Sequence, residues 1–395
     1  MSPPAATDSA APRLPLREGF TTGSAATAAS VAALRLLLDG LALTEADIPV
    51  PPGARISRRL SIPIASVTRL DAHTALGAVI KDGGDDPDAT HQARIEAVIR
   101  LDAENPADPA DPEDAGDEAR APERTVIHID GGPGVGRATL PGLPVQVGQA
   151  AINPATRAQI ALALEELMAS RDLSGCVSVE IRVPDGETIA LSTLNPRLGV
   201  VGGISILGTQ GTVRAYSHEA WRQAIVQGLS VAQALGCTHI ALSSGRRSDT
   251  LLMDAYAWPE QCFIQAADFV GHAVREAAAR HFGHIVWGGF FGKLVKIAQG
   301  HASTHARDTS IDFTVLADAC ARSGLDPGRA QAVKQANTAA QALEIIQEDA
   351  AADAVLTGQA LLARDTLRAF ACDAVLTPRI TVHLFHLNGT ELTRV

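Results

Sequence analysis

The chain has 395 residues, of which 46% are hydrophobic and 19% charged, and its formal net charge at pH 7 is −11. This length is too great for one ordinary hydrophobic core, so we expect two domains. No apolar stretch of the sequence approaches the roughly 18–20 residues needed to cross a bilayer, so we expect no membrane span. Nucleic-acid binding is not expected either, because no basic stripe with interleaved aromatic residues is present.

Two segments are expected to lie outside the folded parts. Residues 1–13 are rich in alanine, proline and serine and lack the basic and apolar regions of a signal peptide, which predicts a disordered lead-in. Residues 102–124 are a low-complexity Pro/Ala/Asp sequence that contributes −7 of the net charge, which predicts a flexible solvated loop. The five cysteines form no Cys-x-x-Cys pair. Their scatter indicates a reducing, cytoplasmic compartment and no structural zinc site.

The pattern from residue 14 to residue 198 predicts an α+β domain with a mixed or antiparallel sheet. Its first helix should be capped by Thr21 or Thr22, run through small residues and stop at Gly40. Strands are expected over 60–70, 75–80, 93–101, 125–129, 178–183 and 188–194, and a second helix over 155–168 after Asn153. We expect 93–101 and 125–129 to pair as an antiparallel hairpin with the acidic loop at its tip.

From residue 199 to residue 305, strands alternate with helices, which predicts a Rossmann-like α/β domain. Strands are expected at 238–242, 262–265 and 284–287, and helices at 217–235, 268–281 and 293–299. Residues 306–395 should be mainly helical, with a closing strand at 379–387 that could return to the first domain. Ligands of such parallel sheets bind beyond the carboxyl ends of the strands, where glycine turns lie.

A glycine run from Gly199 to Gly211 places five glycines in an apolar sequence. Glycine weakens helices and strands by about 0.5–1 kcal/mol relative to alanine, so the backbone here must approach something closely. We favour a ligand loop and expect bulky residues at Gly203 or Gly208 to weaken binding more than folding. The alternative is a tightly packed bend at the domain junction.

Four further segments carry residue types suited to chemistry. Residues 17–24 begin a helix, where free N–H groups favour an anion, although an ordinary capping turn is the alternative. Residues 81–90 hold four acids, which could bind a cation, act as a general base or form an acidic solvated turn. Residues 131–136 superficially suggest a dinucleotide fingerprint, but the sequence after them cannot open a helix cleanly. Residues 288–293 precede a helix that carries lysines, which indicates an anion site.

Two histidines and two phenylalanines accompany the last of these segments. His301 and His305 are four residues apart and could share a helix face, but the absence of a third ligand argues against zinc, so we expect no protein-bound metal. Phe290 and Phe291 are candidates for contact with a flat ligand.

In chain order, these segments resemble one family, the cobalt-precorrin-5B C1-methyltransferases of anaerobic-type cobalamin biosynthesis (the CbiD family). The matching elements are Arg17-x-Gly19-Phe20-Thr21-Thr22-Gly23, Lys81-Asp82-x-Gly84-Asp85-Asp86-Pro87-Asp88-x-Thr90, Gly134-Val135-Gly136 with Pro141-Gly142-Leu143, Ala151-Ile152-Asn153-Pro154, Asn195-Pro196-Arg197-Leu198-Gly199 through Gly211, and Gly289-x-x-Gly292-Lys293-Leu294-x-Lys296. The resemblance covers about residues 15–305 well and the remainder more loosely.

The resemblance implies methyl transfer from S-adenosylmethionine to C1 of a cobalt-containing corrinoid, giving cobalt-precorrin-6A. Positioning and electrostatics should dominate such a transfer, and the several carboxylates of the corrinoid should meet cationic side chains. Asp85, Asp86 or Asp88 is expected to stabilise the sulfonium or to accept a proton. The residues expected to bind S-adenosylmethionine are Thr21, Thr22, Gly23, Gly202, Gly203, Ser205, Gly208 and Thr209. Those expected to bind the substrate are Arg197, Arg214, Arg246, Gly289, Phe290, Gly292, Lys293, Lys296, His301 and His305.

Two alternatives stay open on the sequence. One is an NAD(P)H-dependent reductase that uses the glycine run as its cofactor loop, and the other is a non-catalytic corrinoid-binding protein. A reductase should carry an acidic residue after the next strand, whereas 238–242 leads into Ser-Ser-Gly-Arg-Arg. In every case the cobalt belongs to the substrate, and a homo-oligomer is a possible assembly.

Overall fold

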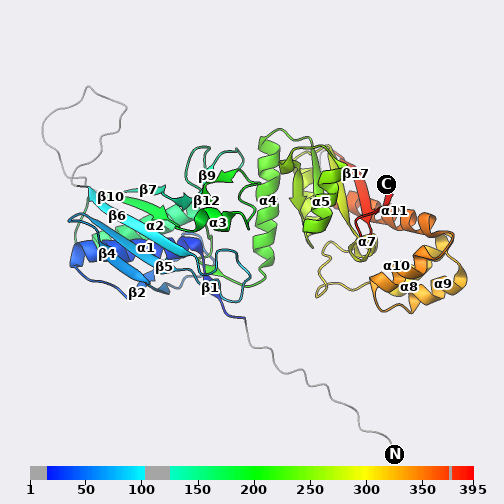
Figure 1. Cartoon of the computed structure of the whole chain (residues 1–395), viewed down its shortest axis with the longest axis horizontal. Helices are drawn as coiled ribbons and strands as arrows, with labels where there is room; N and C mark the ends of the chain where they lie inside the picture. The colour runs from blue at the N-terminus through cyan, green and yellow to red at the C-terminus, as the bar shows by residue number, and fades with distance from the viewer. Residues whose placement is uncertain (1–15, 103–124, 373–375) are drawn as a thin grey trace, which may run out of the picture. The chain divides into compact units, whose positions relative to one another are not determined.

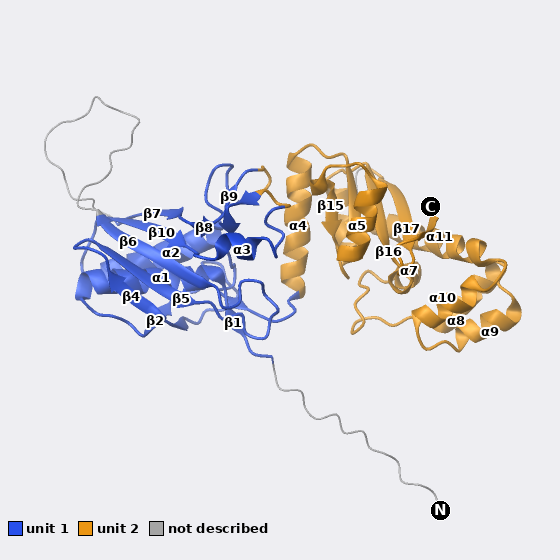
Figure 2. Cartoon of the chain, viewed as in Figure 1, with its two compact units in different colours: residues 1–139, 144–196, 200–217 blue, residues 140–143, 197–199, 218–395 orange. Residues whose placement is uncertain are grey.

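The structure, a computed structural model, describes residues 16–102, 125–372 and 376–395. The chain forms two compact units (Figure 2): unit 1 holds the described residues of 1–139, 144–196 and 200–217, and unit 2 those of 140–143, 197–199 and 218–395. The predicted lead-in and nearly all of the predicted acidic loop lie outside the described residues. Within those residues, every helix is too short or too polar to cross a membrane.

A five-stranded sheet forms the centre of unit 1 (Figure 1). In spatial order its strands are β4 (Ser66–Arg69), β5 (Thr74–Ile80), β6 (Arg94–Asp102), β10 (Cys176–Arg182) and β7 (Val126–Gly131). Neighbouring strands are antiparallel except β10 and β7, which are parallel. The expected hairpin of 93–101 with 125–129 is therefore wrong. Strand β10 lies between them, because helix α2 (Pro154–Ala169) carries the chain from β7 back to a parallel neighbour.

Short paired strands complete the β-structure of unit 1. They are β1 (Gly19–Phe20) with β13 (Thr212–Val213), β2 (Glu45–Ile48) with β3 (Leu60–Pro63), β8 (Gly134–Val135) with β12 (Gly203–Ile204), and β9 (Arg137–Ala138) with β11 (Val200–Val201). The strand expected at 188–194 is wrong, because α3 (Gly186–Ala190) is a short helix followed by turns. Glu187 in its first turn favours this helix start electrostatically.

Helix α1 (Thr22–Asp39) begins and ends as expected. Thr21 Oγ1 accepts a hydrogen bond from Ser24 N at 3.1 Å, and Gly40 adopts the left-handed φ of +67° that ends the helix. Helix α2 likewise begins after Asn153, whose side chain accepts from Ala155 N at 2.9 Å. Local capping chemistry therefore sets the start of both helices.

The small side chains of α1 let it lie unusually close to the sheet. Its residues from Thr22 to Leu34 are all buried, and the hydroxyls of Thr27 and Ser30 donate to carbonyls one turn earlier at 2.9 and 2.8 Å. A Cβ at Gly77 on β5 would lie under 3.0 Å from the backbone of α1. Glycine at this position is therefore required by the distance between helix and strand.

A second five-stranded sheet forms the centre of unit 2. In spatial order its strands are β15 (Phe263–Gln265), β14 (His239–Ser243), β16 (His284–Phe290), β17 (Arg379–Phe385) and β18 (Glu391–Arg394). The first four strands are parallel and β18 is antiparallel. Strand β17 thus pairs with β16 in unit 2 and does not return to the first domain as we had expected. The strand order reverses between β14 and β16, which makes this point of the sheet its topological switch point.

Helices follow and precede these strands in unit 2. They are α4 (His218–Ala234), α5 (Arg246–Ala255), the 3-10 helix η1 (Glu260–Cys262), α6 (Val270–Ala279), α7 (Phe291–Ala298), α8 (Phe313–Arg322), α9 (Pro327–Lys334), α10 (Ala339–Gln347) and α11 (Ala352–Phe370). The mainly helical stretch after residue 306 agrees with the expectation. Helix α7 ends before Gly300, whose φ is +90°, so the expectation that His301 and His305 share a helix face is wrong.

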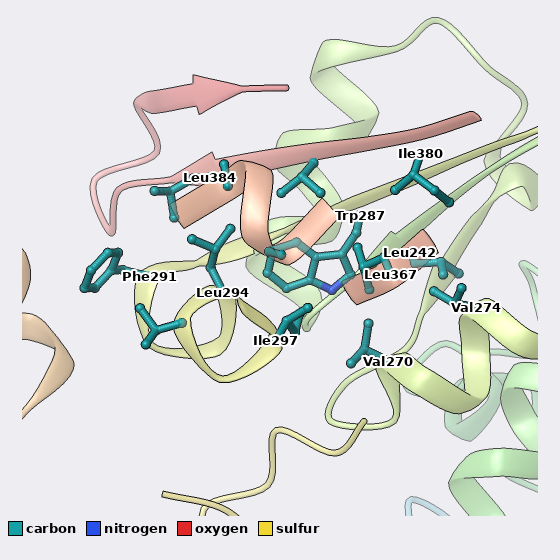
Figure 3. Packing of buried hydrophobic residues seen from close by; sticks show 14 of the residues in the cluster. Leu242, Val270, Val274, Trp287, Phe291, Leu294, Ile297, Leu367, Ile380 and Leu384 are labelled. Carbon is teal, nitrogen blue, oxygen red and sulfur yellow. The ribbon is translucent and has the colours of Figure 1, made fainter. Parts of the chain in front are cut away.

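The main core of unit 2 covers one face of its sheet. Trp287 on β16 is 1% exposed, and Figure 3 shows its indole close to Leu294 and Ile297 of α7. A smaller cluster around Phe263 and Val286 covers the opposite face, with Leu252 of α5 packed on it. Both faces of the parallel strands are therefore covered.

The surroundings of two histidines on this second face lower their pKa values. His383 is fully buried, with Nε2 2.7 Å from the Tyr256 hydroxyl and Nδ1 3.1 Å from Glu391 Oε1. Burial lowers the pKa of His383, although the charge of Glu391 opposes this shift. Burial also lowers the pKa of His284, whose Nε2 lies 2.9 Å from Thr381 Oγ1.

We expect the free energy of unfolding to fall as the pH is lowered through about 6.5, the ordinary histidine pKa, because the unfolded chain then binds protons that the folded chain does not. The stabilisation is complete above that pH and is lost below it. A His383→Asn variant should lose part of this dependence, by at most about 1.4 kcal/mol per pH unit. Denaturant unfolding of both proteins across this range measures the slopes, and equal slopes would contradict the prediction.

Candidate functional site

Two of the segments singled out in the sequence, residues 17–24 and 81–90, meet the end of the glycine run in unit 1. We call residues 17–24, 81–90 and 207–216 the helix-start cluster. Phe20 N donates to Asp82 O at 2.9 Å, and Thr21 N donates to Gly211 O at 3.1 Å. The start of α1 is therefore joined both to residues 81–90 and to the end of the glycine run.

The polar groups at the start of α1 hold the glycine run against the helix. Gly23 N donates to Leu207 O at 3.0 Å. The Thr22 hydroxyl donates to Leu207 O at 3.1 Å and accepts from Leu207 N at 2.9 Å. The donors that we assigned to an anion are thus engaged within the protein. Binding of S-adenosylmethionine by Thr21, Thr22 and Gly23 stays a prediction.

Two glycines of the run contact other backbone or side-chain atoms directly. A Cβ at Gly203 would lie under 3.0 Å from Gly134 O, and one at Gly208 under 3.0 Å from Thr21 Oγ1. The tightly packed bend that we gave as the alternative describes these positions. Because the space beside both glycines is already filled by the protein, bulky residues there should also weaken folding. The expectation that they weaken binding more than folding stays a prediction.

Other members of the run differ in exposure. Gly202 and Thr209 are exposed, and a Cβ at Gly202 would meet no described atom within 4 Å. Ser205 is half-buried, and its hydroxyl lies 3.4 Å from Asn195 Oδ1. Gly202 and Thr209 are thus the predicted cofactor-binding residues with free space beside them.

Residues 81–90 are held in place by their own carboxylates. Arg17 pairs with both carboxylate oxygens of Asp82, and hydrogen bonding to Arg17 lowers the pKa of Asp82. Asp85 Oδ2 accepts from Arg17 N at 2.7 Å, and Asp86 Oδ1 accepts from Tyr216 N at 2.9 Å. Asp85 and Asp86 each keep a second carboxylate oxygen available for a cationic ligand.

Asp88 is the counter-ion of a buried lysine. Lys81 is 1% exposed, and its Nζ lies 2.6 Å from Asp88 Oδ2. The other oxygen of Asp88 accepts from Thr90 N and Oγ1 at 2.7 and 2.8 Å. Burial alone would raise the pKa of Asp88, but the charge and hydrogen bond of Lys81, together with Thr90, lower it. This environment favours a structural role for Asp88 over proton acceptance.

A second group of predicted residues lies at the carboxyl edge of the sheet in unit 2. Residues 244–247 and 290–293 lie where β14 and β16, the two strands that flank the switch point, lead into helices α5 and α7. Together with Asp268 they form what we call the switch-point cluster. Helices α5 and α7 both begin here, and neither has a side-chain capping hydrogen bond. Arg246 and Arg247 are exposed at the start of α5, and the guanidinium of Arg247 lies 6.0 Å from the ring centroid of Phe290.

Lys293 joins the loops of the switch-point cluster. Its Nζ donates to Ser244 O at 2.8 Å and lies 3.2 Å from Asp268 Oδ1. Lys296, one turn further along α7, donates to Thr304 O at 2.9 Å. Arg246, Phe290 and Lys293 are thus brought to one edge, as the sequence suggested.

Several residues that we expected to contact the substrate are packed closely against other parts of unit 2, and the expected substrate contacts of Gly289 and Gly292 stay a prediction. Strand β16 runs through Gly288 and Gly289 to Phe290, so these glycines are not a loop. A Cβ at Gly289 would lie under 3.0 Å from the ring of Trp287, and one at Gly292 would lie 3.2 Å from Ala339 Cβ. Phe291 is 3% exposed within the core, so its expected contact with a flat ligand is wrong.

The two expected substrate arginines outside these loops have acidic partners. Arg197 lies 2.9 Å from Asp249 Oδ2 and 3.2 Å from Glu260 Oε1, both in unit 2. Arg214 in unit 1 is exposed and lies 2.8 Å from Glu18 Oε1. Their role in substrate binding stays a prediction, as does that of His301 and His305, which are half-buried.

Asp249, a polar residue at the edge of the unit 2 sheet, was not among the residues expected from the sequence. Asp249 accepts from Ser243 Oγ at 3.0 Å and from Gln265 Nε2 at 3.0 Å. The signal in the sequence that could have identified such a residue is its position at or after the carboxyl end of a strand. Groups of three or more potential metal-ligating side chains do not occur in the part of the chain that the structure describes.

These features define a mixed α/β protein with sheets of mixed orientation and a polar carboxyl sheet edge, where small ligands bind in folds of this kind. The chain belongs to the CbiD family. The family described as CbiD matches residues 9–215, and the one described as CbiD, C-terminal domain, matches residues 303–395.

Two relatives of this chain with known names agree with that assignment. The cobalt-precorrin-5B C(1)-methyltransferase of Nitratidesulfovibrio vulgaris is 51% identical over 395 residues, which cover 99% of this chain and 95% of that protein. The protein of the same name from Geobacillus kaustophilus is 44% identical over 334 residues, or 84% and 83% of the two chains. The crystal structure of cobalamin biosynthesis protein (cbiD) from Archaeoglobus fulgidus is 27% identical, covers 71% of this chain and 79% of that one, and gives a TM-score of 0.37.

We expect Gly203→Ala to lower the free energy of unfolding by about 1–3 kcal/mol, because the added methyl group overlaps the backbone at Gly134. Gly202→Asn is the matched control. It adds a larger side chain to the neighbouring residue, where the space is open and the φ of +84° is one that asparagine tolerates. Thermal and denaturant unfolding measure the difference. If Gly203→Ala is as stable as the control, the close approach is not a folding constraint.

Proposed function

We propose that this protein transfers the methyl group of S-adenosylmethionine to C1 of cobalt-precorrin-5B, a step in cobalamin biosynthesis. The observation that carries the proposal is 51% identity with a protein of that activity across nearly the full length of both chains. The names of the relatives support methyl transfer and give no support to a nicotinamide-dependent reductase. None of the five cysteines, all of which the structure describes, forms a disulfide bond, which suits a reducing compartment such as the cytoplasm.

The main role of the protein in this reaction is to position two ligands. The nucleophilic C1 forms a bond to the methyl carbon while the carbon–sulfur bond breaks, and S-adenosylhomocysteine leaves with the electron pair. This displacement needs an in-line arrangement and a site that tolerates the sulfonium charge. A covalent nucleophile on the enzyme is not required.

The helix-start cluster is our candidate for the sulfonium site. Asp85 and Asp86 offer carboxylate oxygens that are held in place from the backbone of Arg17 and Tyr216. Tyr216 is 60% exposed, so its ring offers an aromatic face for a cation beside Asp86. A carboxylate with a neighbouring aromatic ring suits a positively charged sulfur.

The switch-point cluster is our candidate for the corrinoid carboxylates. Arg246 and Arg247 stand at the uncapped start of α5, and Lys293 stands at the start of α7. Guanidinium and ammonium groups at helix starts attract carboxylates. We further propose that unit 2 is Rossmann-like in this respect, with its ligand at the carboxyl ends of β14 and β16.

Incubation of the full-length protein with S-adenosylmethionine and cobalt-precorrin-5B should yield S-adenosylhomocysteine and a corrinoid heavier by one methylene unit, both detectable by mass spectrometry. Calorimetric titration should show binding of S-adenosylmethionine and none of NADPH. Consumption of NADPH with the corrinoid would instead favour a reductase. Corrinoid binding without S-adenosylhomocysteine would favour a carrier.

We expect Asp86→Asn to weaken binding of S-adenosylmethionine about ten-fold, which corresponds to about 1.4 kcal/mol. The amide oxygen can still accept from Tyr216 N, so the loop should keep its conformation while the negative charge is lost. Asp71→Asn is the matched control, because Asp71 Oδ1 accepts from His73 N at 2.8 Å in an exposed turn of the same unit. Equal affinity of the two variants, measured by titration, would remove Asp86 from the site.

A further inference from the structure

A row of rings follows the carboxyl end of strand β15. The ring of Phe269 is 7% exposed and packs edge-on against His218, with centroids 5.2 Å apart. The guanidinium carbon of Arg222 lies 5.6 Å from the centroid of the same Phe269 ring. The ring of His218 in turn lies 5.8 Å from that of His305. His218 and Arg222 are four residues apart on α4, which places them on one face of the helix.

His305 is held in position by its neighbour Thr304. Thr304 is 3% exposed, and its hydroxyl donates to Asp268 Oδ1 at 2.8 Å. Thr304 N also donates to Asp268 O at 3.0 Å, and Thr304 O accepts from Lys296 Nζ at 2.9 Å. These bonds fix both the side chain and the backbone of Thr304, so His305 is ordered before a ligand arrives.

Two of the three basic groups in this row, Arg222 and His218, form no internal ion pair among the described residues, whereas His305 interacts with the charge of Asp268. Among the described residues, no carboxylate forms an ion pair with Arg222 or His218 within 4.0 Å. Asp268 is already paired with Lys293 at 3.2 Å and with Thr304. The carboxylate of Glu219, next to His218, lies 3.4 Å from Gln223 Nε2. An anionic ligand would therefore meet Arg222 and His218 without a competing carboxylate within 4.0 Å of either side chain.

We propose that His218, His305 and Arg222 bind one carboxylate side chain of the corrinoid, an inference that rests on the proposed function. The guanidinium offers paired N–H donors that match the two oxygens of a carboxylate, and each imidazole offers one more. Arg222 and His218 pack against the ring of Phe269. Thr304 is a positioning residue for His305. The site adds a contact at β15 to those of the switch-point cluster.

Titration of the full-length protein with two corrinoids tests the proposal. Cobyrinic acid carries free carboxylate side chains, whereas those of cobinamide are amidated. We expect His218→Asn/His305→Asn to bind cobyrinic acid about ten-fold more weakly and cobinamide unchanged. His281→Asn is the matched control, because His281 is exposed in the same unit and its φ of +62° suits asparagine. This control should bind both corrinoids as the wild type does.

Variants of Thr304 test the positioning role separately. Thr304→Val should weaken binding of cobyrinic acid. Thr304→Ser should bind it as the wild type does, because serine retains the hydroxyl that donates to Asp268. Thermal unfolding of each variant shows whether it is folded at the temperature of the titration.

The outcomes separate this inference from the proposed function. If the wild type binds neither corrinoid, the proposed function fails and this inference fails with it. If the wild type binds cobyrinic acid and the folded double variant binds it equally well, the carboxylate site is overturned and the proposed function stands. An equal loss of affinity for both corrinoids in a folded variant also overturns the site, because the contact would then not depend on the carboxylate.

Discussion

Unit 1 depends on backbone segments that lie closer together than any side chain allows. A Cβ at Gly19 would lie under 3.0 Å from Asp82 O, and one at Gly84 under 3.0 Å from Arg17 O. The same segments exchange backbone hydrogen bonds, including Asp85 N to Arg17 O at 3.1 Å. Residues 81–90 are therefore positioned by main-chain contacts, which hold their carboxylates more rigidly than contacts from long side chains would. Such order suits a reaction that depends on the placement of its ligands.

Unit 2 positions its polar residues by a different means. There the strands place them at one edge, and ion pairs connect the loops that follow. Lys293 joins the loops after β14 and β15 from the start of α7, and Asp249 joins β14 to β15. Lys293 and Asp249 thus each have partners on neighbouring elements. We assign ligand carboxylates to Lys293 and to the exposed arginines Arg246 and Arg247 at this edge.

The sequence predicted elements whose signals are local and missed contacts that depend on the whole fold. Thr21, Asn153 and Gly40 gave the helix boundaries because capping involves only neighbouring residues. The alternation at 93–101 identified β6 but not its partner, since the insertion of β10 depends on where α2 returns the chain. Gly289 was taken for a loop residue because the ring of Trp287, which fills the space beside it, belongs to tertiary packing. The contact between Phe269 and His218 was not predicted for the same reason.

The position of β17 has a consequence for synthesis of the protein. Strand β16 ends at Phe290, and its neighbour β17 begins only at Arg379, after helices α8 to α11. Unit 1 has its last residues by position 217, so it can fold while the ribosome is still making the other half. Until residue 385 emerges, however, the apolar strand β16 has an open edge, and such edges invite pairing with other chains. If the ribosome pauses between these two strands, the nascent chain therefore has a folded unit 1 and an unpaired edge of β16 that is prone to aggregate.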